Sequence, residues 1–375
     1  MNNHREIKMR DLRISESEIE NYSLIIKRIM RHGQFILGPE NEEFEEYLIS
    51  LTGSKHAIGV ASCSSGLYLS LRSLRLNPGD EIITTPMSWL VSSSAIVRAG
   101  GVPVFVDVDG DYNIDFGKIK EAYSSKTKGV LVVHFYGKIV DKIDEIKNFC
   151  EARKIWLIED CAQSVGAKLN NTYSGTFGDF GVYSFSPMKV IPSFGDAGAV
   201  LLKGDSKKDI IKSLKHCGTT GDLETAIDAE IKHNLDPIHA AIAGYNLKRA
   251  DQILDNRRKI AYTYLESLSK LDKDAIVLPS EGIEGAHTWY DFTIRSKYRE
   301  KLMDFLKKNM IHTAIRHPKL ISDQPGIPGR QAGALENAKK YVDEIMCLPI
   351  YNTMKMDDAE YVSDKINEFF TRKLY

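Results

Sequence analysis

The feature that most constrains the fold of this chain is a regular alternation of short apolar runs with helical stretches. It extends over the first two-thirds of the 375 residues. The apolar runs carry β-branched or aromatic residues between Gly, Pro, Asp or Ser, which is typical of strands, and they cover residues 81–85, 103–107, 129–134, 155–158, 182–185 and 199–202. Between them, helical patterns cover residues 65–76, 90–99 and 141–153. This alternation predicts an α/β fold with a largely parallel sheet and helices on both faces.

The last third of the chain has a different pattern. A long helical stretch runs from about residue 237 to residue 268 and is suited to join two domains. The remainder predicts a small α+β domain, with strands near 288–294 and 313–315 and helices near 298–309, 336–346 and 357–370. The Pro- and Gly-rich stretch 321–331 predicts a mobile loop. We expect two domains: an N-terminal segment with a large domain over 1–250, and a small domain over 251–375.

Charge and cysteine content exclude several classes of function. The chain has 50 basic and 51 acidic residues without a basic stripe, so no nucleic-acid partner is expected. The N-terminus lacks the apolar core of a signal peptide, and no uncharged apolar run approaches the length of a membrane span. We therefore expect a cytoplasmic protein without a membrane partner. The five cysteines are scattered and lack CxxC spacing, so neither a metal site nor a disulfide framework is expected.

The first candidate site is the sequence IEDCAQ at residues 158–163, directly after an apolar strand. Ligands of open α/β sheets bind at the carboxyl ends of the strands, and a carboxylate there can keep a pyridine nitrogen protonated. We assign this role to Asp160 and regard Glu159 as the weaker candidate. The alternative is that Asp160 is an ordinary helix N-cap, which is the better interpretation when this motif is considered alone.

The second candidate is YSFSPMK at residues 183–189, where a strand ends in Ser-Pro and a lone lysine follows. A lysine in such a turn can form a Schiff base and move a substrate proton, and we assign this role to Lys189. Ser184 could offer its hydroxyl to a phosphate. Most lysines are solvated surface residues, but residues 186–192 contain no other charge, which favours a functional role.

The third candidate is a run of small residues, 61–66, that precedes a helical pattern. Ser64 and Ser65 stand where the first turn of a helix would present amides and hydroxyls to a phosphate. Ordinary serine capping of the helix explains this feature equally well by itself. Trp89 follows another strand end, where an indole could stack on a planar ring, although tryptophans are more often core residues.

Together these motifs resemble the DegT/DnrJ/EryC1/StrS family of fold-type I aminotransferases. The resemblance runs from GQFILGPENEEFE at residues 33–45 to CLPIYNTM at residues 347–354, with GDEIITTPMSW, VVHFYG, IEDCAQSVGA, SGTFGDFGVYSFSPMK and HTWYDFTIR between them in the family's order. It implies a large domain with a mostly parallel seven-stranded sheet flanked by helices, and a small α+β C-terminal domain. It also implies pyridoxal 5'-phosphate as the cofactor.

The resemblance further implies a role for each matching residue around the cofactor ring. Lys189 falls on the Schiff-base lysine, and Asp160 falls on the aspartate paired with the pyridine nitrogen. Gln163 falls on the glutamine near the ring's 3-hydroxyl group. Trp89 falls on the aromatic residue that stacks on the ring.

Other matching residues fall around the cofactor's phosphate. Ser184 and Ser64 fall on phosphate contacts, with the amides of Cys63 and Ser64 helping. The segment KHNLDPIHAA resembles a family stretch whose asparagine, here Asn234, reaches the phosphate in the neighbouring subunit, with Lys232 nearby. The resemblance thus implies a homodimer with composite active sites.

The implied reaction moves an amino group from L-glutamate to the ketone of a nucleotide-linked keto-sugar, for amino sugars and surface polysaccharides. Two stretches depart from the family: FGDAGAV at residues 194–200 stands for the usual GEGGA, and CSS at 63–65 stands for Gly-Thr-Asp or Gly-Thr-Ala. The first of them should lie near the substrate. A smaller phosphorylated ketone, such as dihydroxyacetone phosphate giving serinol phosphate for polysaccharide decoration, is therefore an alternative acceptor.

Other hypotheses concern the acceptor's charge and the class of protein. Basic residues that could meet a diphosphate, or simply be solvated, are Arg31, His32, Arg316, His317 and Lys319.

Two other classes of protein are alternatives. A catalytically idle family member with a regulatory role would need none of the four residues assigned around the ring, which are Trp89, Asp160, Gln163 and Lys189. A NAD-dependent oxidoreductase would need a G-x-G-x-x-G turn, which this chain lacks.

Overall fold

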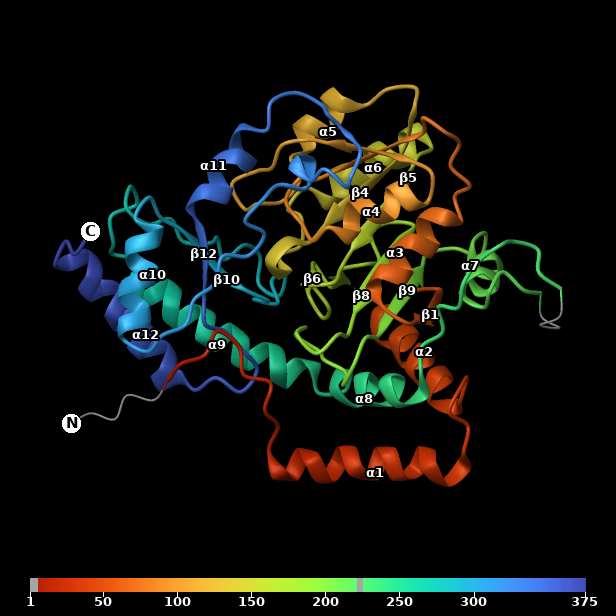
Figure 1. The fold of residues 1–375 in the computed structure, drawn as a ribbon, viewed down its shortest axis with the longest axis horizontal. Coiled ribbons are helices and arrows are strands. Elements are labelled where there is room, and N and C mark those ends of the chain that lie inside the picture. Colours follow the sequence, from red (N-terminus) through yellow and green to blue (C-terminus); the bar gives the residue numbers. More distant parts are fainter. Residues whose placement is uncertain (1–5, 221–224) are drawn as a thin grey trace.

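The computed structural model describes residues 6–220 and 225–375, with an α/β part joined to a smaller α+β part (Figure 1). The central sheet has eight strands in the order β1-β9-β8-β5-β4-β2-β3-β11. They are β1 (His56–Val60), β2 (Glu81–Thr84), β3 (Val102–Phe105), β4 (Thr127–Val133), β5 (Trp156–Asp160), β8 (Phe180–Ser184), β9 (Gly198–Leu202) and β11 (Arg330–Gln331). Strand β9 pairs antiparallel with β1 and β8, and all other pairs in this sheet are parallel. The sheet is therefore mostly parallel, as expected.

The two edges of the sheet differ from the sequence-based expectations. Strand β1, which the apolar pattern did not single out, pairs with β9 at one edge. At the other edge the stretch 321–331, predicted as a mobile loop, instead lies against the large sheet. Its last two residues form β11, which adds an eighth strand to the expected seven, and the amide of Ile321 donates to the carbonyl of Pro86 at 2.8 Å.

Helices cover both faces of the sheet, because successive strand residues point to opposite sides. Ile82 packs under α3 (Cys63–Arg72) and α4 (Val91–Arg98), whereas Ile83 packs with α5 (Phe116–Ala122) and α6 (Ile143–Arg153). The other elements of this part are α1 (Glu16–His32), α2 (Pro39–Thr52), η1 (Phe135–Gly137), the hairpin β6 (Lys168–Leu169) and β7 (Thr172–Tyr173), α7 (Lys208–Lys215) and α8 (Pro237–Leu247). Helix α1 lies along α8 at the bottom of Figure 1.

The smaller part packs helices on a two-stranded antiparallel sheet. Its elements are α9 (Ala250–Leu268), β10 (Phe292–Arg295), α10 (Arg299–Lys308), α11 (Glu336–Glu344), β12 (Ile345–Leu348) and α12 (Met356–Thr371), whereas η2 (Ile321–Asp323) lies against the large sheet. The prediction of one helix over 237–268 is wrong, because the chain breaks between α8 and α9, where Arg249 has φ −106° and ψ 9°. The strand predicted at 313–315 is reduced to one bridge, between Ala314 and Cys347.

The N-terminal segment crosses to the smaller part. Ile7 is buried in the core of that part, its amide donates to the carbonyl of Met310 at 2.9 Å, and its own carbonyl accepts from the amide of His312. We propose a large domain within 1–250 and a small domain within 251–375. The first described residues of the chain pack on the small domain, and residues 321–331 return to the large sheet. No helix of residues 6–220 or 225–375 is long and apolar enough to cross a membrane.

Candidate active site

Asp160 is the last residue of β5 and lies at the carboxyl end of the parallel strands. Its side chain is buried, and one carboxylate oxygen accepts a hydrogen bond from the hydroxyl of Ser92 on α4 at 2.7 Å. The other oxygen accepts from the amide of Ala162 at 3.1 Å. A turn rather than a helix follows, so the carboxylate does not cap a helix. Asp160 is held from two sides and faces the strand-end edge where ligands of such sheets bind.

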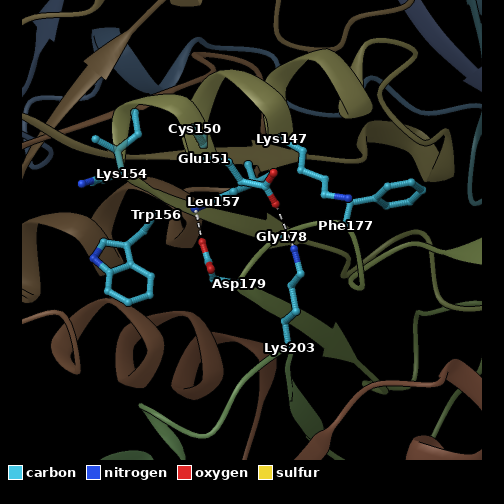
Figure 2. A pocket seen from close by; sticks show the side chains of 11 residues that line it. Lys147, Cys150, Glu151, Lys154, Trp156, Leu157, Phe177, Gly178, Asp179 and Lys203 are labelled. Atoms are coloured by element: carbon cyan, nitrogen blue, oxygen red, sulfur yellow. Dashed lines mark hydrogen bonds and ion pairs between the residues drawn. The ribbon is translucent and has the colours of Figure 1, made fainter.

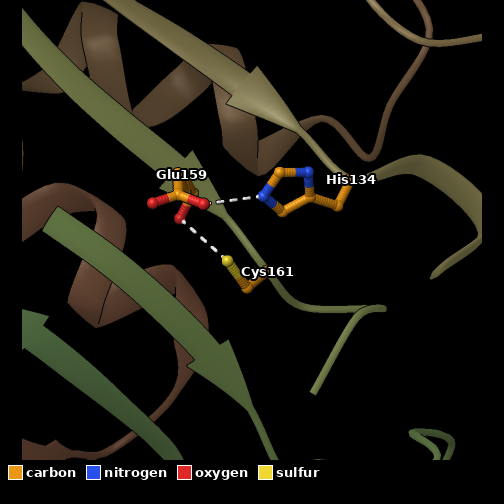
Figure 3. Close-up of side chains that lie close together, drawn as sticks. All are labelled: His134, Glu159 and Cys161. Atoms are coloured by element: carbon orange, nitrogen blue, oxygen red, sulfur yellow. Dashed lines mark hydrogen bonds and ion pairs between the residues drawn. The ribbon is translucent and has the colours of Figure 1, made fainter. Parts of the chain in front are cut away.

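Glu159 precedes Asp160 and therefore points to the opposite face of the sheet. Its carboxylate accepts hydrogen bonds from the amides of Gly175 at 2.8 Å and Gly178 at 2.6 Å. His134 Nε2 lies 2.8 Å from the same carboxylate, while His134 Nδ1 accepts from the amide of Val140 (Figure 3). In the neutral ring Nε2 is thus the donor.

Cys161 lies close enough to complete a set of three potential metal ligands with these two residues (Figure 3). The carboxylate of Glu159 and both nitrogens of His134 are, however, already engaged in hydrogen bonds. We therefore assign this cluster a structural role, in which it ties β4, β5 and the turn before β8 together.

Gln163 follows Asp160 on the same side. The side chain is buried, and its Oε1 accepts from the amide of Tyr136 at 2.6 Å, while its own carbonyl accepts from the hydroxyl of Thr288 at 2.6 Å. The amide nitrogen of its side chain has no hydrogen-bond partner within residues 6–220 and 225–375. It is free to donate to a ligand.

The first turn of α3 presents two free amides. Ser62, not Ser64 or Ser65, is the N-cap, since its hydroxyl accepts from the amide of Ser65 at 3.1 Å. The amides of Cys63 and Ser64 have no acceptor in the described part of the chain. A Cβ on Gly198 would lie 2.6 Å from the amide nitrogen of Cys63, so β9 needs glycine there to let this turn approach.

The side chains around this turn have separate environments. The hydroxyl of Ser65 contacts His233 Nδ1 at 3.1 Å, which gives Ser65 a part in packing the capped turn. The thiol of Cys63 lies 3.9 Å from Asp160. Ser184 is buried at the end of β8, and its side-chain hydroxyl makes no hydrogen bond with the residues that the structure describes.

Lys189 lies in the turn after β8, and the carbonyls on either side of it are held by distant residues. Arg10 donates to the carbonyl of Met188, and Asn352 donates to the carbonyl of Val190 at 2.8 Å. Lys189 Nζ lies 4.9 Å from the centre of the Tyr290 ring, and no carboxylate of the described residues pairs with it. The lysine is half-buried over an aromatic ring, which differs from a solvated surface lysine.

The Cys63 thiol is affected by the charges of both Asp160 and Lys189. Burial raises the pKa of this thiol well above its usual value, Asp160 raises it further, and Lys189 opposes this shift. Cys63, Asp160 and Lys189 come from the start of α3, the end of β5 and the turn after β8.

Trp89 lies at the rim of this cluster rather than in the core. Its side chain is 62% exposed, and its ring centre lies 6.1 Å from that of His317. The preceding residue, Ser88, contacts the hydroxyl of Ser92, which donates to Asp160. An exposed indole at this position is suited to stack on a planar ring.

Asn234 is placed within its own chain. Its side-chain amide lies 3.0–3.2 Å from His216 Nδ1, and its backbone bridges to Val60, shortly before the first turn of α3. Its contact with a neighbouring subunit stays a prediction.

Five residues of this region had no role assigned from the sequence: Arg10, Ser92, Tyr136, Tyr290 and Asp291. Tyr136 belongs to the VVHFYG stretch and Tyr290 and Asp291 to the HTWYDFTIR stretch, so these three could have been singled out.

One cavity of about 230 Å³ lies at the start of β5, the end opposite Asp160, and includes Trp156, Asp179 and Lys203 (Figure 2). Two of its charged residues have partners there, since Asp179 accepts from the amide of Leu157 and Lys203 pairs with Glu151. Another cavity, of about 680 Å³, borders the Lys189 turn between the N-terminal segment and α9.

His317 makes the stability of the site dependent on pH. The pKa of His317 is lowered to about 4, chiefly by burial; Asp291 opposes this shift, and Arg316 and Lys189 add to it. The folded chain thus binds fewer protons than the unfolded chain between about pH 4 and the usual histidine pKa of about 6.5. This contribution to stability is complete above that window and is lost as the pH falls through it.

Replacement of His317 by Asn should remove this dependence. Asn tolerates the left-handed backbone of this position, where φ is 54°. Between pH 7 and pH 4, wild type should lose about 1–2 kcal/mol more unfolding free energy than His317→Asn, which is less than the full shift implies because the ring is partly exposed. Urea unfolding at both pH values measures the difference. Equal losses in the two proteins would contradict the prediction, because they would show that the pKa of His317 is the same in the folded and the unfolded chain.

Comparison with known proteins gives a consistent result. Residues 16–367 match the model of the DegT/DnrJ/EryC1/StrS aminotransferase family. The chain is 32% identical over 349 residues to a Geobacillus stearothermophilus protein named "Pleiotropic regulatory protein", covering 92% of this chain and 93% of the relative. It is also 32% identical to the dTDP-3-amino-3,6-dideoxy-alpha-D-galactopyranose transaminase of Aneurinibacillus thermoaerophilus, covering 92% and 94%.

Solved structures agree with this result. S. venezuelae DesV, determined in complex with a ketimine intermediate, superimposes with a TM-score of 0.91 at 27% identity, covering 97% of this chain and 98% of that one.

Proposed function

Because this chain belongs to the DegT/DnrJ/EryC1/StrS aminotransferase family, we propose that it moves an amino group from L-glutamate to the ketone of a nucleotide-linked keto-sugar. The chain is an aminotransferase of the pyridoxal-phosphate-dependent fold-type I class. The sugar acceptor is supported by the 32% identity to a dTDP-sugar transaminase over 92% of this chain. This similarity is the observation that carries the proposal.

The residues at the strand ends fit pyridoxal phosphate. When bound, this cofactor supplies an aldehyde that accepts the amino group and a ring that takes up electrons. The free amides of Cys63 and Ser64 and the hydroxyl of Ser184 would hold its phosphate, because a helix N-terminus favours anions. Trp89 would cover the ring, and the free amide group of Gln163 would donate to the ring's hydroxyl group.

Two residues would carry the chemistry. Lys189 would attach the cofactor and, once released by the amino donor, its Nζ would take the proton from the donor's Cα. Asp160, fixed by Ser92 and the amide of Ala162, would keep a proton on the pyridine nitrogen.

We also propose that the active unit is a homodimer in which Asn234 reaches the partner's site. Three consecutive apolar side chains before α2 support an interface: Phe35, Ile36 and Leu37 are 55%, 59% and 47% exposed. Contiguous exposed apolar surface of this kind marks an interaction site.

The proposal is tested with the purified holoenzyme and a panel of ketones. L-glutamate should abolish the visible absorbance of the lysine-linked cofactor, and a dTDP- or UDP-linked keto-sugar should restore it. Dihydroxyacetone phosphate serves as the alternative acceptor. Restoration by that ketone alone would replace the sugar proposal, and a protein that stays colourless with added pyridoxal phosphate would contradict the catalytic role of the site.

A further inference from the structure

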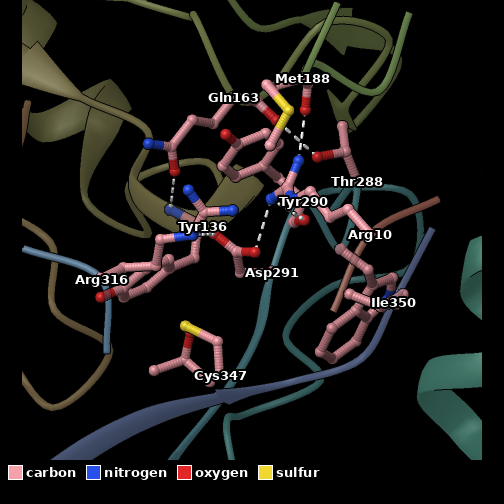
Figure 4. A network of polar contacts seen from close by, with 12 residues as sticks. Arg10, Tyr136, Gln163, Met188, Thr288, Tyr290, Asp291, Arg316, Cys347 and Ile350 are labelled. Atoms are coloured by element: carbon pink, nitrogen blue, oxygen red, sulfur yellow. Dashed lines mark hydrogen bonds and ion pairs between the residues drawn. The ribbon is translucent and has the colours of Figure 1, made fainter. Parts of the chain in front are cut away.

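Asp291, just before β10, is a buried carboxylate shared by two arginines (Figure 4). One oxygen accepts a hydrogen bond from Arg10 at 2.6 Å. The side chain of Arg10 is 8% exposed, and its guanidinium lies 4.1 Å from the centre of the Tyr290 ring. Both terminal nitrogens of Arg10 are engaged, because they also donate to the carbonyls of Met188 and Tyr290.

Arg316 is held differently. Its Nε lies 3.7 Å from the second carboxylate oxygen of Asp291, and neither of these two buried atoms has a hydrogen-bond partner in the described part of the chain. The side chain of Arg316 is 27% exposed, and its two terminal nitrogens likewise make no hydrogen bond with the described residues. An ion pair at this distance anchors the base of the guanidinium and leaves its outer edge free.

The free edge of Arg316 lies on the wall of the candidate active site. In Figure 4 its guanidinium lies beside Tyr136 and Gln163, the pair joined by the hydrogen bond to Gln163 Oε1. His317, the residue after Arg316, has its ring centre 6.1 Å from that of Trp89 and 5.1 Å from that of Phe135. Two arginines against one aspartate leave an excess positive charge here, and a guanidinium edge suits a carboxylate or phosphate.

We propose that Arg316 is the anion-binding residue of the substrate pocket and that Arg10, through Asp291, is its positioning residue. The free edge of Arg316 pairs with an oxyanion of a substrate. This inference rests on the proposed aminotransferase function, in which the donor carries a carboxylate and the acceptor a phosphate.

The test follows the two half-reactions of the holoenzyme separately by absorbance. Arg316→Met should raise the half-saturating concentration of one anionic substrate about 30- to 100-fold, the size expected for a lost charge-assisted pair. Arg316→Lys should recover only part of this, because lysine cannot pair through two nitrogens. Arg372→Met, on the exposed end of α12, is the matched control and should behave as wild type.

The two anion sources give different results. A defect confined to the glutamate half-reaction, with maleate binding by calorimetry weakened by the same factor, identifies the donor's carboxylate. A defect confined to the ketone half-reaction identifies the acceptor's phosphate. Unchanged half-saturation in both, in variants with normal cofactor absorbance, would overturn the inference and leave Arg316 as a counterion of Asp291. Absence of cofactor absorbance in wild type would instead contradict the proposed function.

Discussion

Replacing Lys189 with alanine is expected to abolish both turnover and the visible absorbance of the lysine-linked cofactor. The rate should fall by roughly 10⁴-fold or more, as when the nucleophile of a covalent mechanism is removed. The turn that carries Lys189 is held by hydrogen bonds to the carbonyls on either side of it, and the Nζ of Lys189 lies over the Tyr290 ring. Alanine at this position has no amine to attach the cofactor. Turnover with saturating glutamate and ketone, together with an absorbance spectrum, measures both effects.

A matched control separates this role from a general effect of losing a lysine. Lys203→Ala removes a lysine that pairs with Glu151 at the far end of the sheet, and both spectrum and turnover should be unchanged. The Lys189 variant should unfold at the same urea concentration as wild type, because its amine makes no ion pair with the described residues. Near-normal activity of Lys189→Ala would show that another group carries the chemistry.

Replacing Asp160 with asparagine should lower turnover by about 10²- to 10³-fold while the protein stays folded, since one preorganised charge at the reacting system is lost. Asn keeps an oxygen for the amide of Ala162 and changes the volume little. Its neutral side chain cannot favour a proton on the pyridine nitrogen. Ser92→Ala, which removes one hydrogen bond to this carboxylate, should have a smaller effect on the same rate.

The opposite result is expected for the neighbouring carboxylate, that of Glu159, whose loss should affect stability rather than turnover. Glu159→Gln should lower the unfolding free energy by about 2–3 kcal/mol, because the amides of Gly175 and Gly178 and the His134 ring lose a charged acceptor. Turnover per folded molecule should change little. If Asp160→Asn instead cost stability and spared turnover, Asp160 would be a structural residue and its assignment would be wrong.

The local pattern of the chain was sufficient for the architecture and for the residues at strand ends. Alternating strands and helices predicted the mostly parallel sheet, and the family motifs predicted aminotransferase chemistry with pyridoxal phosphate, as the comparisons show. Asp160 and Ser184 could be proposed because each ends a strand whose pattern is visible in a few residues, and Lys189 because it lies in the turn after such a strand. The local pattern did not predict β1, and it predicted α8 and α9 as one helix, because neither the strand nor the break between the helices carries a strong local signal.

The surroundings of Lys189 were decided only by the tertiary structure. Arg10 and Asp291 are 281 residues apart in sequence, and Arg10 and Met188 are 178 apart, yet they meet at this turn. Local periodicity reports only on near neighbours, whereas these contacts depend on the path of the N-terminal segment across the small-domain core. By itself, then, the sequence determined the sheet and the candidate lysine and aspartate. Burial and long-range packing decided that Glu159 is structural, that Arg10 is occupied, and that Arg316 keeps a free edge toward the site.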